Sequence, residues 1–269
     1  MSKKTNVPSV GNRALIARLT RTASGGLVSV AEAAEGLGFP RRTAALKLAS
    51  LARRGWLLRV RRGLYFIVPL ENEPGRPVTL DDPWLLAREV FSPCYIGGWS
   101  AAEYWGLTEQ LFRSTLVITA AHTRATSVNL LGQEYRLLRV PRARVEGATL
   151  VWRGAERVPV SSRERTIIDC LRHPALCGGI RHFVHILREY KASSEYDPET
   201  LLAVARQAGN GAVWKRFGYI VEALWPDEAK FVDEARAHLG AGNVKLDPTV
   251  RRRGTLLSRW RLWVNLPLE

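Results

Sequence analysis

Apolar positions recur at helical intervals three times near the start of the chain. They predict short helices near residues 15–19, 30–37 and 41–54. Ser29 stands three residues before Glu32. This is the spacing of a capping box, in which each of the two residues satisfies a backbone N–H group at the start of a helix. Glycines precede and follow the second helix, so the pattern indicates three helices joined by tight turns.

The third of these helices has two contrasting faces. Ala44, Leu48 and Leu51 share one face and are expected in the core. The opposite face carries small and cationic side chains. A helix that enters the major groove needs this arrangement, because small residues let the backbone approach the bases and arginines reach guanine edges or phosphates. The residues that we expect to read the major groove are Arg41, Arg42, Thr43, Lys47 and Ser50.

Two short apolar runs follow the third helix and predict a β-hairpin. They cover residues 56–60 and 64–68 and enclose Arg61-Arg62-Gly63, in which the glycine supplies the turn. Three helices and such a hairpin form a winged helix-turn-helix, whose wing lies against the DNA backbone or in the minor groove. We therefore expect Arg61 and Arg62 to hold the wing on DNA. Further phosphate contacts are expected from Arg53, Arg54 and Arg59.

Charge is distributed unevenly along the chain. The first seventy residues contain thirteen lysines and arginines against two acids, a net charge of +11, whereas the whole chain carries +15. The phosphates of duplex DNA are the obvious partner for such an excess. A charge run can also be merely a solvated face, and a helix-turn-helix can serve dimerisation. Because both the exposed helix face and the hairpin tip are basic, DNA binding is the better interpretation.

Proline, glycine and acids are concentrated at residues 71–83. We interpret this segment as a linker between a winged helix-turn-helix domain, residues 1–70, and a larger domain, residues 84–269. Strands come first in the larger domain and helices later, an order typical of α+β folds rather than doubly wound sheets. Strands are expected near residues 116–119, 135–140, 149–152 and 157–160, and a short turn or strand is expected at residues 95–98. Helices are expected near residues 84–90, 100–105 (capped by Ser100), 163–171, 180–191, 197–208, 211–225 and 227–239.

The predicted fold class is therefore α+β, with an N-terminal winged helix-turn-helix followed by a larger mixed α+β domain that is helical toward the C-terminus. Five motifs stand in a definite order along it. They are Arg62-Gly63-Leu64-Tyr65, Tyr95–Ala102, Trp105–Gln110, Ser161–Asp169 and Lys215–Glu222. Their order and spacing resemble the AbiEi-type antitoxins and transcriptional regulators of bacterial AbiE toxin–antitoxin systems, over roughly residues 10–225.

This resemblance implies a protein that binds inverted repeats in the promoter of its own operon and represses transcription. It also implies that the larger domain opposes a partner toxin of the nucleotidyltransferase-like class, with or without a stable complex. In the larger domain we expect four exposed cations to form a second basic surface for DNA or an acidic partner. They are Arg163, Arg165, Lys215 and Arg216. Ordinary surface charges are the equally weighted alternative.

A cluster of cysteines and histidines needs separate consideration, because zinc takes such ligands. Cys170, His173, Cys177, His182 and His185 fall within sixteen positions, but their spacing is irregular and lacks a Cys-x-x-Cys anchor. Packed helices with incidental histidines are the better interpretation, and we expect no metal site and no cofactor.

The run Pro226–Lys230 spells a superficial nuclease signature. Its two acids are consecutive on a helix and point about 100° apart, so they are poorly placed to share one magnesium ion. A helix with acids in its first turn is the better interpretation.

The resulting hypothesis is a cytoplasmic antitoxin and repressor without enzymatic activity. Its partners would be double-stranded operator DNA and a cognate toxin. Three cysteines make no disulfide framework, and no signal peptide or membrane-spanning run is evident. Two alternatives stay open: a stand-alone regulator whose C-terminal domain senses a ligand, and a metal-dependent enzyme that acts on DNA.

Overall fold

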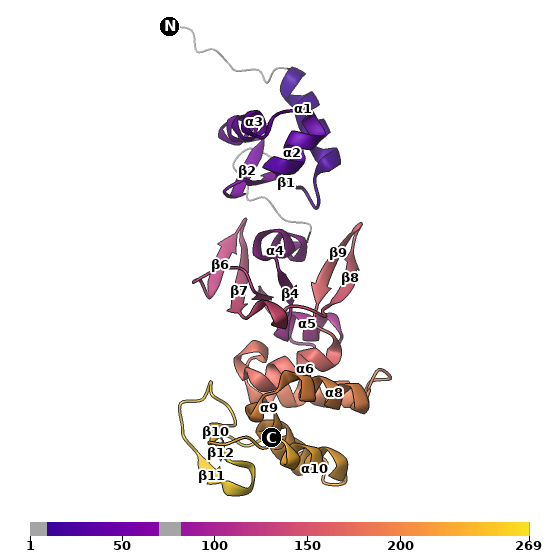
Figure 1. Ribbon diagram of the computed structural model, residues 1–269, viewed down its shortest axis with the longest axis vertical. Coiled ribbons are helices and arrows are strands. Elements are labelled where there is room, and N and C mark those ends of the chain that lie inside the picture. The colour runs from indigo at the N-terminus through magenta and orange to yellow at the C-terminus, as the bar shows by residue number, and fades with distance from the viewer. Residues whose placement is uncertain (1–9, 70–81, 269) are drawn as a thin grey trace.

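The computed structural model describes residues 10–69 and 82–268. The elements are stacked in three tiers along the long axis (Figure 1). The first tier is a small module of helices and a short sheet, the second is a six-stranded sheet with helix α4 on it, and the third is a layer of helices with a second small sheet at its far end.

The first tier is a winged helix-turn-helix, as predicted. Strand β3 lies in the middle of a three-stranded sheet and pairs antiparallel with both β1 and β2. The three-residue strand β1 was not expected, because so short a segment shows no alternation. The elements of this tier are α1 (Val10–Thr22), β1 (Leu27–Ser29), α2 (Val30–Leu37), α3 (Arg41–Arg53), β2 (Leu57–Arg61) and β3 (Leu64–Ile67).

The predicted capping box begins α2. The Ser29 hydroxyl accepts from the Glu32 N–H at 3.2 Å, and the Ser29 N–H donates to Glu32 Oε2 at 2.7 Å. Gly38 ends the helix with a φ of 70°, a conformation that favours glycine. The predicted inward face of α3 is also confirmed, since Ala44, Leu48 and Leu51 are all buried.

The second tier is a mixed sheet in the order β6-β7-β5-β4-β9-β8. Helix α4 (Pro83–Phe91) covers the face toward the first tier, while α5 (Gly98–Tyr104) and the third-tier helices cover the other face (Figure 1). The strands are β4 (Cys94–Ile96), β5 (Ser114–Thr119), β6 (Ser127–Leu130), β7 (Gln133–Arg139), β8 (Thr149–Arg153) and β9 (Glu156–Val160).

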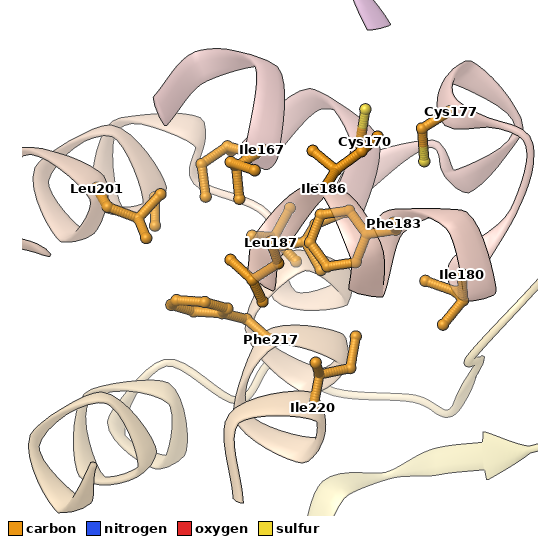
Figure 2. Packing of buried hydrophobic residues seen from close by; sticks show 14 of the residues in the cluster. Ile167, Cys170, Cys177, Ile180, Phe183, Ile186, Leu187, Leu201, Phe217 and Ile220 are labelled. Atoms are coloured by element: carbon orange, nitrogen blue, oxygen red, sulfur yellow. The ribbon is translucent and has the colours of Figure 1, made fainter. Parts of the chain in front are cut away.

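The third tier is a helical layer around one apolar core. Figure 2 shows Ile167 of α6, Phe183 of α7 and Phe217 of α9 packed together in it. Its helices are α6 (Arg163–Arg172), α7 (Ile180–Ala192), α8 (Pro198–Ala208), α9 (Gly211–Leu224) and α10 (Ala229–Ala237). The far sheet contains β10 (Val244–Lys245), β11 (Thr255–Leu257) and β12 (Leu262–Val264). Short 3₁₀ turns are η1 (Arg142–Arg144), η2 (Pro174–Cys177) and η3 (Ser258–Trp260).

Several local expectations need correction. Gly97, not Ser100, is the N-cap of α5, and the Ser100 hydroxyl instead accepts from the Leu116 N–H at 2.9 Å. Helix α10 begins at Ala229 rather than 227. Strand β6 and the far sheet were not expected, because strands of two to four residues give little periodicity.

Most of the predicted linker, residues 71–83, lies outside the described residues. Its last two residues form the start of α4: Asp82 is the N-cap, whose carboxylate accepts from the Trp84 N–H at 2.8 Å, and Pro83 is the first helical residue. The division into domains at this segment stays a prediction.

The first two tiers share an apolar cluster. Leu64 and Phe66 of β3 are buried with Leu85 of α4 and with the adjacent face of the large sheet. Arg88 of α4 adds polar contacts, since its Nη2 donates to the Ser24 hydroxyl at 2.8 Å and its Nη1 to the Arg157 carbonyl at 2.6 Å. The winged module is therefore packed on α4 rather than merely tethered to it.

A double-mutant cycle tests this contact. Phe66→Ala and Leu85→Ala should each lower the free energy of unfolding by about 2–5 kcal/mol, because each removes a buried side chain. The combined loss should be smaller than the sum, since both side chains support one cluster. Urea denaturation followed by circular dichroism measures all three values. Leu85→Ala combined with Leu48→Ala, which lies in the separate core of the module, should be additive. Additivity in the first pair would contradict the shared cluster.

Candidate nucleic-acid interface

The exposed face of α3 is basic, as the sequence predicts. Arg41, Arg42 and Lys47 are exposed, and Thr43 and Ser50 are half-buried beside them. Within residues 10–69 and 82–268, none of the three cations forms an ion pair with a carboxylate. Their charge is directed at solvent and has no described internal partner.

Leu46 is a member of this face that the sequence analysis missed. Its side chain is 66% exposed, although it lies one helical turn from both Arg42 and Ser50. An apolar side chain on a basic helix face suits contact with the C5-methyl group of thymine. The signal was present in the sequence, because position 46 falls outside the apolar stripe of positions 44, 48 and 51.

Arg53, Arg54 and Arg59 lie beyond the exposed face of α3. All three are exposed. Arg53 at the end of α3 and Arg59 on β2 line one hollow of about 400 Å³, which Tyr65 also lines. The structure therefore brings together two of the expected phosphate contacts, which come from different elements.

The two arginines of the wing have different surroundings. Arg62 is exposed in the turn, followed by Gly63 with a φ of 79°. Arg61 is also exposed, but its Nη2 donates to the Glu89 carbonyl of α4 at 3.1 Å. One edge of the Arg61 guanidinium is thus turned toward α4, and only its other donors face away.

The expected exposure of Lys215 and Arg216 is wrong. Their exposed fractions are 1% and 5%. Lys215 Nζ donates to the carbonyls of Ala241 and Gly242 at 2.9 and 2.7 Å. Residues 240–247 fold back over α9, and nothing in the helical pattern of α9 indicates that cover. Burial lowers the pKa of Lys215 below its usual value.

Arg216 is held in a cage of carbonyl groups. Its Nε donates to Lys245 and Leu246 at 3.1 and 3.0 Å, and its Nη1 donates to Leu171 and Arg172 at 2.7 and 3.2 Å. Burial lowers the pKa of Arg216 to about 10, so the guanidinium stays charged at neutral pH. The residue fastens the far sheet to α6 and α9 and takes no part in an exposed surface.

Arg163 and Arg165 are only half-buried. Arg163 lies over the Trp105 ring at 4.6 Å and 3.7 Å from a Glu195 carboxylate oxygen. Arg165 lies over the Tyr95 ring at 4.2 Å and donates to the Glu146 carbonyl at 2.6 Å. The four expected cations therefore do not form one surface.

The cysteines and histidines are arranged as packing residues. Cys170 and Cys177 are buried free thiols, and their mutual hydrogen bond and burial raise the pKa of Cys170. His182 is hydrogen-bonded to the Thr108 hydroxyl at 2.7 Å and to the Cys177 carbonyl at 2.6 Å, whereas His185 is exposed. The described ranges contain no group of three or more His, Cys, Asp or Glu side chains placed to hold a metal ion.

The acids of the superficial nuclease signature are separated. Glu228 pairs with Lys191 of α7, and Asp227 is exposed just before α10.

Among the helices in the described part of the chain, none is long and apolar enough to cross a membrane.

The winged module is similar to a known protein family. Residues 17–68 match the family model of AbiEi-antitoxin transcriptional regulators. The match runs from α1 to the end of the wing. For this part of the chain it confirms the resemblance that the sequence predicts. The family is regulatory rather than catalytic. No curated protein matches the chain.

The whole chain also has a structural relative. It matches the crystal structure of the RV2827C protein from Mycobacterium tuberculosis with a TM-score of 0.59 and 19% sequence identity, over 95% of this chain and 91% of that one. At this identity the likeness concerns the fold. It extends the similarity from the winged module to the larger α+β part.

The cage around Arg216 can be tested by stability. Arg216→Met keeps much of the side-chain volume but leaves four carbonyls, in two buried and two partly buried hydrogen bonds, without their donor. It should lower the free energy of unfolding by at least about 3 kcal/mol. Thermal and urea unfolding measure the loss. Arg188→Met, at an exposed position of α7, is the matched control and should change stability by less than about 0.5 kcal/mol. Equal losses of stability in the two variants would contradict the burial of Arg216 among these carbonyl groups.

Proposed function

We propose that this protein is an antitoxin of a type IV toxin–antitoxin system that also binds inverted repeats in its own promoter and represses transcription. The observation that carries the proposal is the solvent face of α3, where cations without described ion pairs surround a half-buried Thr43 and Ser50. That face lies within the segment that matches the AbiEi regulators. A second protomer would read the second half of each inverted repeat, since recognition helices pair with half-sites.

In this proposal α3 enters the major groove. Arg41, Arg42, Thr43, Lys47 and Ser50 face the bases and adjacent phosphates, and Leu46 meets a thymine methyl group. Arg53, Arg54 and Arg59 hold the backbone beside the helix. At the wing, Arg62 contacts DNA from the tip, and Arg61 contributes the donors that Glu89 does not use.

The larger domain would oppose a nucleotidyltransferase-like toxin in the cytoplasm, without enzymatic activity of its own. Arg163 is the best remaining candidate for its antitoxin surface. Arg165, Lys215 and Arg216 are engaged with main-chain carbonyls and serve the fold. The shared cluster between the tiers makes point variants of the full chain better probes than truncations, which would expose Leu64 and Phe66.

Salt dependence tests the electrostatic part of the proposal. If the basic module neutralises about five to eight phosphates per protomer, the log–log slope of affinity against salt should be about −5 to −7. Fluorescence anisotropy with a labelled promoter duplex between low and physiological salt measures it. A slope near −1 would show that the basic face is only a solvated surface.

Base readout by Leu46 has a chemical test. Replacing operator thymines by deoxyuridine removes only methyl groups. Where Leu46 contacts one, this should weaken binding of the native protein by about 1 kcal/mol, the value of burying one methyl-sized group. Leu46→Ala should bind the thymine and deoxyuridine duplexes equally.

Arg42→Ala is the control for this pair. It should weaken specific binding by about 1–3 kcal/mol while leaving the thymine preference intact. If native protein and Leu46→Ala respond alike to deoxyuridine, Leu46 does not face a thymine.

Growth rescue separates the two activities. Replacing Arg41, Arg42 and Lys47 by alanine in the full chain should abolish promoter repression but still rescue cells from the partner toxin supplied from a separate promoter. Arg163→Glu should do the reverse, because it inverts a charge of the larger domain outside the winged module. Arg188→Glu is the matched charge control. Loss of rescue in the α3 variant would place the antitoxin surface in the winged module instead.

A further inference from the structure

A cavity of about 410 Å³ opens in the larger domain between η1, α6 and α8. Its wall carries three guanidinium groups, those of Arg144, Arg165 and Arg172. Two carboxylates, those of Asp169 and Glu146, also line it. The cavity belongs to the second and third tiers and is separate from the exposed face of α3 (Figure 1).

The charge of Asp169 is already used within the protein. The residue is 5% exposed, its Oδ1 accepts from Arg144 Nη2 at 3.1 Å, and its Oδ2 accepts from the Tyr95 hydroxyl at 2.6 Å. Arg165 Nε lies 3.9 Å from the same carboxylate. Asp169 therefore fixes the orientation of Arg144, and both of its oxygens already accept hydrogen bonds within the protein.

Arg165 is fixed as well. Its guanidinium lies over the Tyr95 ring and donates to the carbonyls of Arg144 and Glu146. These bonds hold η1 and the residues after it against the start of α6. The cavity wall is thus preorganised, and little side-chain freedom remains to be lost when a ligand binds.

Arg172 has no comparable partner. It stands three residues after Asp169 on α6, and among the described residues it forms no ion pair with a carboxylate. Its side chain makes one long hydrogen bond, 3.4 Å from Nη1 to the Ala208 carbonyl. Burial, followed by the charge of Arg144, lowers the pKa of Arg172. The same two arginines, after burial, lower the pKa of the adjacent His173.

The cavity therefore holds more positive than negative charge in a half-buried place. Three guanidinium groups face one buried carboxylate that two of them already neutralise, and Glu146 is exposed. Half-buried charge without a counter-charge is costly, and a bound anion removes that cost. Guanidinium groups match the geometry of phosphate oxygens through paired N–H donors.

We infer that this cavity binds a small phosphate-bearing molecule, with Arg144 and Arg172 donating to the phosphate oxygens. The volume lies within the range of small-ligand sites and exceeds what a lone inorganic ion fills. The inference goes beyond DNA contact and does not rest on it. It gives the larger domain a ligand of its own.

Thermal unfolding of the full chain tests the inference. Inorganic phosphate and adenosine 5′-monophosphate are added separately at constant ionic strength, with sodium chloride as the reference. At about ten times its dissociation constant, a bound ligand should raise the melting temperature by roughly 3 °C. Arg172→Gln should weaken binding about ten- to a hundred-fold, the value of a hydrogen bond to a charged group. Titration calorimetry with the same two probes gives the constants directly.

Two further variants keep the test decisive. Gln207→Glu puts a negative charge on the exposed cavity wall and should weaken binding even if Arg172→Gln folds poorly. Arg188→Gln changes the net charge by the same amount at an exposed position of α7 and should leave binding unchanged.

A stronger response to the nucleotide than to phosphate identifies a phosphate ester, and an equal response identifies the phosphate group alone as the recognised part. The inference is overturned if neither probe exceeds chloride, if Gln207→Glu and Arg188→Gln behave alike, or if only duplex DNA produces a shift. Loss of promoter binding in otherwise responsive protein would concern the DNA-binding proposal only.

Discussion

The contact between the wing and α4 is the constraint on which the arrangement of the tiers depends. Leu64 and Phe66 face away from the exposed side of the module and are buried with α4 residues. The other side of α4 covers the large sheet, so one short helix is packed between two elements of structure. Because the apolar cluster is continuous through it, the orientation of α3 relative to the sheet is set by packing.

Much of the winged module could be predicted because its signals are local. A capping box, a glycine stop and a 3.6-residue apolar period depend on residues within one or two turns of each other. The same holds for α6 to α9, whose bounds follow their apolar stripes closely. The basic face of α3 could be predicted equally well, because the exposed face of a helix follows once its buried face is known.

Several errors involve segments distant in sequence, whereas the missed strands β1, β6 and β10 to β12 were too short to show periodicity. Lys215 and Arg216 look exposed in the pattern of α9, but residues from 240 onward cover them with carbonyl groups. Ser100 looks like a cap, but its hydroxyl is taken by strand β5. Arg61 is exposed, as its place in the wing predicts, but its bond to the Glu89 carbonyl of α4 could not be predicted from the local pattern. Leu46 differs from these cases. Its exposure could be predicted from the helical pattern of α3, but leucine is usually expected in the core.

The shared cluster also limits how this protein can change in evolution. A winged module taken from another regulator would arrive with a wing surface matched to solvent or to some other neighbour. Leu85 and the face of α4 around it would then lack their apolar counterpart, and Arg88 would lose the Ser24 hydroxyl. A recombination event that exchanges the module and keeps this packing therefore needs its crossover after α4, so that the helix is inherited together with the module it supports. A crossover before α4 would separate this helix from the apolar wing surface that covers it.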